Sequence, residues 1–179
     1  MTTFADDEAR PRTDPEPRAD ERTTLTGFLT WQRDTIRVKC AGLDAEQLAR
    51  RSVEPSGMSL LGLVRHLADV ERNWFRRILA GLDAPPLYFS DAEPDGEFTA
   101  AAADPDQVLD AAAKWRDEVA FAERFVAEAP DLGLISVGTN RVLGHVSLRW
   151  VLVHMIEEYA RHAGHADLLR ERIDGSVGE

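Results

Sequence analysis

Apolar residues recur at helical spacing along four long segments of the chain, numbered 23–41, 59–80, 104–129 and 147–172. Within each segment they fall three or four residues apart, which places them along one face of an α-helix. The stretch 131–146 is rich in glycine and β-branched residues, and it is compatible with either a short hairpin or a loop. The pattern therefore predicts four long helices and no convincing sheet.

Polar residues at the starts of these segments act as helix signals. Ser59 and Ser147 stand at expected N-cap positions, and Asp104 precedes a proline at the first helical position. The run Asp44-Ala-Glu-Gln47 is a capping box, which predicts a further short helix to about residue 51. The connection 82–103 is too long for a tight turn. We therefore expect an all-α fold, a four-helix bundle with long crossover connections.

The chain of 179 residues has the length of one domain. Residues 1–22 are polar, acidic and proline-bearing, so they bury too little apolar surface to offset chain entropy and predict a disordered tail. Residues 23–175 then form the bundle, and residues 176–179 form a short C-terminal tail.

Charge and composition narrow the classes of partner. The formal net charge of -11 argues against binding to nucleic acid or to an anionic membrane surface, because both attract basic proteins. No apolar run approaches the roughly 18 residues of a spanning helix, and the N-terminus lacks the apolar core of a signal peptide. A single cysteine, Cys40, excludes an internal disulfide and fits a reducing compartment. We therefore expect a cytoplasmic protein.

The last predicted helix carries a line of polar residues beside its apolar face. His154, Glu158 and His162 are four residues apart, and His165 follows three residues later, so they lie along one side of the helix. Buried imidazoles and carboxylates are costly unless they are paired or bind a metal. Glu158 and His162 can reach one divalent ion together. His66, at the edge of the apolar stripe of 59–80, is the candidate third ligand.

Spacing alone leaves another interpretation open. Glu158 could pair with Arg161 or Arg65 on a solvated face, with the histidines satisfied by local hydrogen bonds. The HExxH motif of zinc proteases and the paired Glu-x-x-His motifs of di-iron bundles are both absent, as are phosphate-binding glycine loops and nucleophile elbows.

Two stretches, SGMSLLGLVRHLADVERNWF and SLRWVLVHMIEEYARHAGHADLLRE, resemble the DinB-like superfamily of metal-binding four-helix bundles, and most closely an actinobacterial branch. The resemblance covers about residues 23–175. It implies that His66, Glu158 and His162 hold a divalent metal, a ligand set similar to that of the mycothiol-dependent maleylpyruvate isomerase. Many members have Arg at the position of Ala163 and Gln at that of His165, so substrate specificity is not carried over.

The superfamily includes transferases that use mycothiol or related thiols. The resemblance therefore implies a transferase or isomerase that activates a small thiol, mycothiol first, for attack on a small electrophile. Zinc is the expected ion because three protein ligands and an open position are its catalytic pattern, and nickel, iron and manganese are alternatives. His154 and His165 are candidates for supporting a ligand or moving a proton.

Other functions for the same three ligands remain open. A metal-activated water would make the protein a hydrolase. The bundle could also bind a metal or a small molecule without catalysis. The sequence does not decide the oligomeric state, and a homodimer is one alternative.

Overall fold

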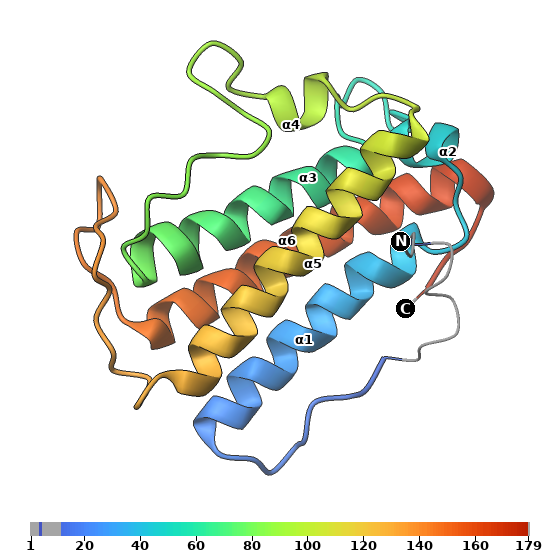
Figure 1. The fold of residues 1–179 in the computed structure, drawn as a ribbon. Coiled ribbons are helices and arrows are strands. Elements are labelled where there is room, and N and C mark those ends of the chain that lie inside the picture. Colours follow the sequence, from blue (N-terminus) through green and yellow to red (C-terminus); the bar gives the residue numbers. More distant parts are fainter. Residues whose placement is uncertain (1–3, 5–11, 179) are drawn as a thin grey trace.

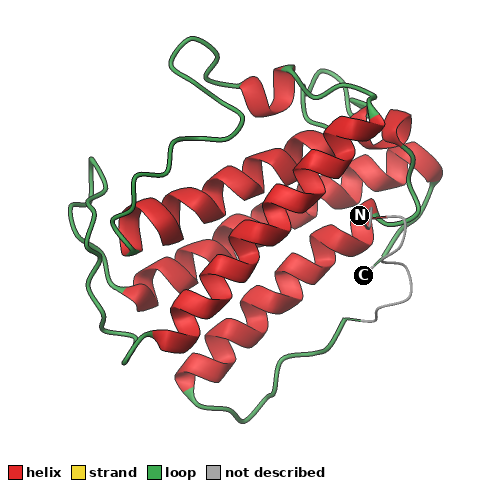
Figure 2. Cartoon of the chain, viewed as in Figure 1, coloured by secondary structure: helices red, strands yellow, loops and turns green. Residues whose placement is uncertain are grey.

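The computed structural model describes residue 4 and residues 12–178, and all regular secondary structure in this part of the chain is helical. Four long helical stretches lie side by side, and long loops connect them (Figures 1 and 2). They are α1 (Glu21–Cys40), α3 (Leu60–Glu71) with its π-helical continuation η2 (Arg72–Leu79), α5 (Pro105–Glu128) and α6 (Leu148–Asp174). Two short helices, α2 (Ala45–Ala49) and α4 (Gly96–Thr99), lie in the connections. The predicted all-α class is confirmed.

The predicted helix signals form their hydrogen bonds. The side chains of Ser59 and Ser147 accept backbone N–H groups three residues later, and Asp44 forms the reciprocal capping box. At its other end α6 runs to Asp174, slightly beyond the predicted residue 172. Gly175 ends the helix in the left-handed conformation, with φ 81°. Residues 131–146 form a loop with isolated bridges, such as the one between Asn140 and Gly144.

The helix predicted over 59–80 changes character in its last third. From Arg72 onward the hydrogen bonds widen, and the N–H of Ala80 donates to the carbonyl of Phe75 five residues earlier. Four bulky side chains of this turn are buried: Trp74, Phe75, Ile78 and Leu79. The wider turn presents two adjacent pairs of apolar residues to the core.

The predicted disordered tail over 1–22 falls partly on residues 1–3 and 5–11, which lie outside the described residues. Helix α1 begins at Glu21, because Asp20 rather than a later residue caps it. Phe4 is buried, with its ring centroid 6.1 Å from that of Trp115. At the other end, residues 176–178 are non-helical and exposed, and residue 179 is outside the described part.

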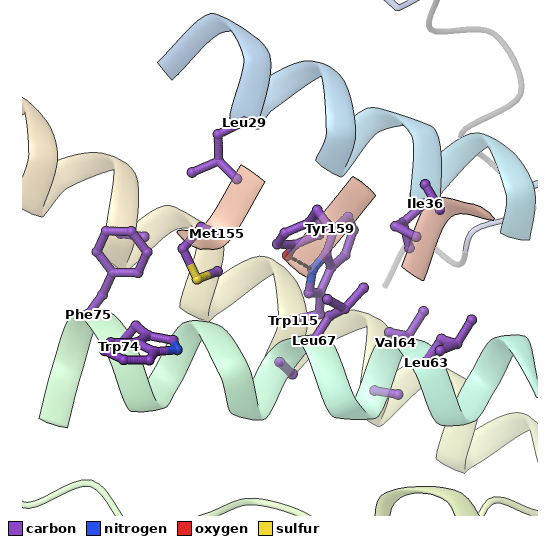
Figure 3. Close-up of a cluster of buried hydrophobic side chains, with 14 of the residues drawn as sticks. Leu29, Ile36, Leu63, Val64, Leu67, Trp74, Phe75, Trp115, Met155 and Tyr159 are labelled. Carbon is purple, nitrogen blue, oxygen red and sulfur yellow. Dashed lines mark hydrogen bonds between the residues drawn. The ribbon is translucent and has the colours of Figure 1, made fainter. Parts of the chain in front are cut away.

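The long helices share one apolar core. Helix α1 packs against α6, and α3 packs against both α5 and α6. Figure 3 shows this core, with Leu29 and Ile36 from α1 facing Leu67 of α3 and Met155 of α6, all fully buried or nearly so. Each such aliphatic side chain contributes about 1.5–3 kcal/mol on burial.

A buried polar network joins the four long helices inside this core. Arg33 of α1 donates two hydrogen bonds of 2.8 Å to Glu71 of α3, whose side chain is 0% exposed. Tyr159 of α6 donates to Glu71 at 2.8 Å. Trp115 of α5 donates to the Tyr159 hydroxyl, also at 2.8 Å (Figure 3). Because a buried charge without its partner is costly, this network favours a single register of the helices.

The connection 82–103 folds back over α3. Both backbone N–H groups of Leu87 and Tyr88 donate to the carboxylate of Asp69, at 2.6 and 3.0 Å. Gly62 allows the close approach of α4, because a Cβ there would lie 2.7 Å from the ring of Phe98. This crossover brings α4 to the part of α3 that carries the predicted ligand.

Within the described residues, no helix combines the length and the apolar character needed to cross a membrane. The cytoplasmic location expected from the sequence stays a prediction.

Candidate metal centre

The three predicted metal ligands lie together on the facing sides of α3 and α6. One ligand atom from each of His66, Glu158 and His162 lies within 4.8 Å of the other two. Glu158 Oε1 is 3.2 Å from His66 Nε2 and 3.3 Å from His162 Nε2. Both imidazoles therefore direct the same ring nitrogen toward one carboxylate oxygen.

Local structure explains half of this arrangement. Glu158 and His162 lie one helical turn apart on α6, so their side chains share a face. The other half is tertiary, because His66 reaches them only through the packing of α3 against α6. The ring centroids of His66 and His162 are 4.7 Å apart. The side chains remain accessible at one edge, with exposed fractions of 23% for His66 and 11% for His162.

The electrostatics of the cluster favour a cation. Hydrogen bonds from His162 and then His66 hold the pKa of Glu158 far below its ordinary value. Burial lowers the pKa of His66, but the carboxylates of Glu158 and Glu97 outweigh burial and the net pKa is raised. An ionised carboxylate between two imidazoles is suited to share a positive charge, whether a proton or a metal ion.

Glu97 is a site residue that the sequence did not indicate. It lies on the short helix α4, and its Oε1 is 3.3 Å from His66 Nδ1. Its other carboxylate oxygen is buried without a hydrogen-bond partner. The ring of Phe98 stacks beside His66, with centroids 5.6 Å apart. No local pattern reveals this role, because it depends on the path of the connection 82–103.

His165 contacts the cluster from α6. Its Nδ1 lies 3.3 Å from His162 Nδ1. Burial, and then the charges of His162 and Arg161, lower the pKa of His165. A neutral His165 is therefore able to accept a hydrogen bond from His162 Nδ1.

His154 has a different environment. Its ring stacks on Trp150, with centroids 5.0 Å apart and an interplanar angle of 16°, and it meets Trp74 edge-on at 4.7 Å. It also lies 3.7 Å from Glu157. The described contacts of His154 are with these residues rather than with the His66, Glu158 and His162 cluster.

The donor set fits a divalent metal ion. A neutral histidine that binds metal through Nε2 carries its proton on Nδ1 and donates it to a neighbouring acceptor. Glu97 is placed to accept that proton from His66, and His165 is placed to accept it from His162. The pattern of a histidine oriented by a carboxylate is common around bound metals.

A family model described as mycothiol-S-transferase matches residues 24–175. The match spans most of the chain and includes both helices of the cluster. The chain belongs to the mycothiol-S-transferase family. Searches among curated proteins and among solved structures found no match.

Membership of the mycothiol-S-transferase family confirms the predicted resemblance at the level of the DinB-like, mycothiol-related superfamily. It also supports a thiol as the partner of the reaction. The closer relation to the mycothiol-dependent isomerase, and the presence and identity of a metal, stay predictions.

Proposed function

We propose that the protein is a metal-dependent mycothiol S-transferase built on a DinB-like four-helix bundle, with one divalent ion held by His66, Glu158 and His162. The observation that carries this proposal is the convergence of two Nε2 atoms on one carboxylate oxygen, within the region matched by the family model. Zinc is the preferred ion, because two imidazoles and one carboxylate leave an open coordination position. Nickel, iron and manganese accept the same donors.

When bound there, the ion supplies a positive charge that lowers the pKa of an incoming thiol and favours its thiolate. Glu97 and His165 hold the tautomers of His66 and His162 that leave both Nε2 atoms free to bind. The edge at which His66 is exposed gives the thiol its access.

The protein's own thiol does not serve as a nucleophile. Cys40 is fully buried, and burial raises its pKa to about 12. Almost none of it is thiolate at neutral pH, so the attacking sulfur comes from the co-substrate. In the transfer, the thiolate sulfur forms a bond to an electrophilic carbon of the second substrate, and the leaving group departs with the electron pair of the broken bond. The thiol proton passes to solvent.

Metal analysis and a conjugation assay test the proposal. The purified protein is expected to bind about one zinc ion per chain, and His162→Ala is expected to lose that zinc. With mycothiol and monobromobimane, the zinc-loaded protein is expected to form the thioether and release bromide, and a chelator is expected to stop the reaction. His145→Ala is the matched control, since His145 lies in the loop before α6 and bonds to the carbonyl of Ser136.

Two results would overturn the proposal. If His162→Ala still binds about one zinc ion per chain, the proposed metal site is wrong. If the zinc-loaded protein forms the conjugate no faster than the uncatalysed reaction, the protein is not a transferase. Turnover of an ester or amide instead would indicate a hydrolase.

A further inference from the structure

A cavity of about 260 Å³ borders the candidate metal centre at His66, and Glu158 and His162 are not part of its lining. It follows one face of α3 and η2 from His66 through Val70 to Trp74, and the connection 82–103 covers it with Phe89 and Glu97. Residues four apart along a helix share a face, so the cavity extends about 12 Å from the metal ligand to the tryptophan. A larger cavity of about 310 Å³ lies between α1 and α5 and includes none of the predicted ligands.

The far part of the cavity is apolar and held in place. Trp74 is 7% exposed, and its ring contacts those of Trp150 and His154, with centroids 5.2 and 4.7 Å away. Val70, Phe89 and Pro94 complete the apolar lining. A fixed aromatic wall favours a flat guest, because stacking is gained without ordering the protein first. The volume is just below the range typical of drug-sized ligands, about 300–1,000 Å³, and suits a single substituted ring.

The carboxylates of the cavity lining have no lysine or arginine beside them among the described lining residues. They belong to Asp69 and Glu97. The Glu97 oxygen without a hydrogen-bond partner is an acceptor and cannot pair with an anion. A carboxylate guest would lose its hydration and find no cation in this wall. The charge of a metal ion is offset by Glu158 and by the thiolate that it attracts, so the metal does not supply the missing partner.

We propose that this cavity receives the electrophile of the transferase, and that the electrophile is an uncharged compound with a flat, apolar ring. The inference rests on the proposed function, since it assigns the second substrate of the same site. In the reaction, the thiolate sulfur bonds to the carbon that carries the halogen, the carbon–halogen bond breaks, and halide departs with its electron pair. The thiol proton goes to solvent. Val70, Trp74 and Asn73 then determine which electrophile is accepted.

A matched pair of electrophiles tests the charge preference. With mycothiol and zinc-loaded protein, kcat/KM is measured for 1-chloro-2,4-dinitrobenzene and for 4-chloro-3,5-dinitrobenzoate, each divided by its uncatalysed rate constant. We expect the neutral compound to be favoured about tenfold or more, the effect of like charge in a partly buried site. Asn73→Lys places a cation in the wall and is expected to raise the normalised value for the carboxylate about fivefold, with the neutral compound as internal control.

A blocking variant tests the location. Val70→Trp fills the cavity midway, so both electrophiles are expected to lose at least about tenfold in kcat/KM while zinc content stays at the wild-type level. Val142→Trp, at a loop position that is 90% exposed, is the control for the added indole. Equal normalised rates for the two electrophiles in the wild type would overturn the charge preference. Unchanged rates in a zinc-loaded Val70→Trp protein would overturn the location.

Binding without chemistry separates this inference from the proposed function. Equilibrium dialysis of the zinc-loaded protein against unreactive 1,3-dinitrobenzene and 3,5-dinitrobenzoate is expected to show binding of the first only, and its loss in Val70→Trp. If the protein shows this binding pattern but conjugates no electrophile, the proposed transferase activity is wrong and the proposed pocket is supported. If the protein conjugates electrophiles but Val70→Trp still binds dinitrobenzene, the transferase activity is supported and the proposed pocket is wrong. Circular dichroism verifies that each variant is folded. If Val70→Trp does not fold, the effect of Asn73→Lys on the two electrophiles tests the location of the pocket.

Discussion

Replacing Glu97 by glutamine tests whether this carboxylate supports His66 as a metal ligand. Glutamine has nearly the same shape and keeps an oxygen that can accept the His66 Nδ1 proton, but it carries no charge. In the wild-type protein Glu97 Oε1 lies 3.3 Å from His66 Nδ1, and the side chains of Glu97 and His66 are only 9% and 23% exposed. Solvent therefore screens their interaction incompletely. Loss of such an outer partner typically weakens metal binding by about 10–100-fold, or about 1.4–2.7 kcal/mol. We expect a zinc Kd about 30-fold higher at pH 8.

The same substitution has a smaller expected effect at pH 6. Burial lowers the pKa of His66, but the carboxylates of Glu158 and Glu97 raise it by more, so the pKa lies above its ordinary value. Protons therefore compete with zinc for His66 in the wild-type protein at pH 6. Without the Glu97 charge that pKa falls and the competition weakens, which offsets part of the lost affinity.

Zinc titration of the metal-free protein against a chromophoric chelator, at pH 6 and pH 8, measures both effects. Glu157→Gln is the matched control, because Glu157 neighbours Glu158 in sequence but pairs with Arg161 and His154. We expect the control to bind zinc within about twofold of the wild type. An unchanged Kd in Glu97→Gln, or an equal loss in Glu157→Gln, would refute the supporting role of Glu97.

Three further predictions follow from buried and ionised groups. Glu71→Leu leaves the buried Arg33 with only the more distant Glu123, at 3.9 Å, and is expected to lower the free energy of unfolding in urea by about 3–5 kcal/mol. Adding Arg33→Met should recover part of that loss, and no recovery would contradict the pairing. In the metal-free protein the pKa of His66 is higher in the folded state than its ordinary value of about 6.5 in the unfolded chain. Protonation of His66 therefore stabilises the fold at low pH, and this stability is lost as the pH rises through the pKa of the folded state. The urea midpoint is thus expected to fall between pH 6 and pH 8 by more in the wild type than in Glu158→Gln, and equal falls would argue against the coupling. Cys40, with its pKa raised to about 12 by burial, is expected to react with a thiol-reactive disulfide only after unfolding, and rapid labelling of the native protein at pH 8 would show that it is accessible.

Local features of the fold could be predicted from the sequence. The four long helices, the N-caps at Ser59 and Ser147 and the capping box at Asp44 depend on residues within a few positions of one another. The pairing of Glu158 with His162 belongs to the same class, because a helix alone brings residues four apart to one face. The π-helical turn of η2 was missed, since periodicity distinguishes poorly between neighbouring helix types in a short run of bulky residues.

The part of the site that depends on the crossover 82–103 could not be predicted. Glu97 lies 31 positions from His66 and on a helix of four residues, so neither spacing nor periodicity connects them. His154 shares the polar line with Glu158, yet the wide turn of η2 and the start of α6 place its ring against Trp74 and Trp150. A helix face tells which residues point the same way, but their neighbours come from other elements.

The sequence by itself determined the four long helical stretches, the caps at Asp44, Ser59 and Ser147, and the acid–imidazole pair on α6, because each arises from hydrogen bonds and contacts that span a single turn. The tertiary structure alone decided that His66 meets that pair, that Glu97 holds the other side of its ring, and that an acidic, tryptophan-walled cavity adjoins it. These features arise where α3 packs against α6 and where the crossover closes over both. Such contacts join residues far apart in the chain, and packing of the whole core sets their geometry.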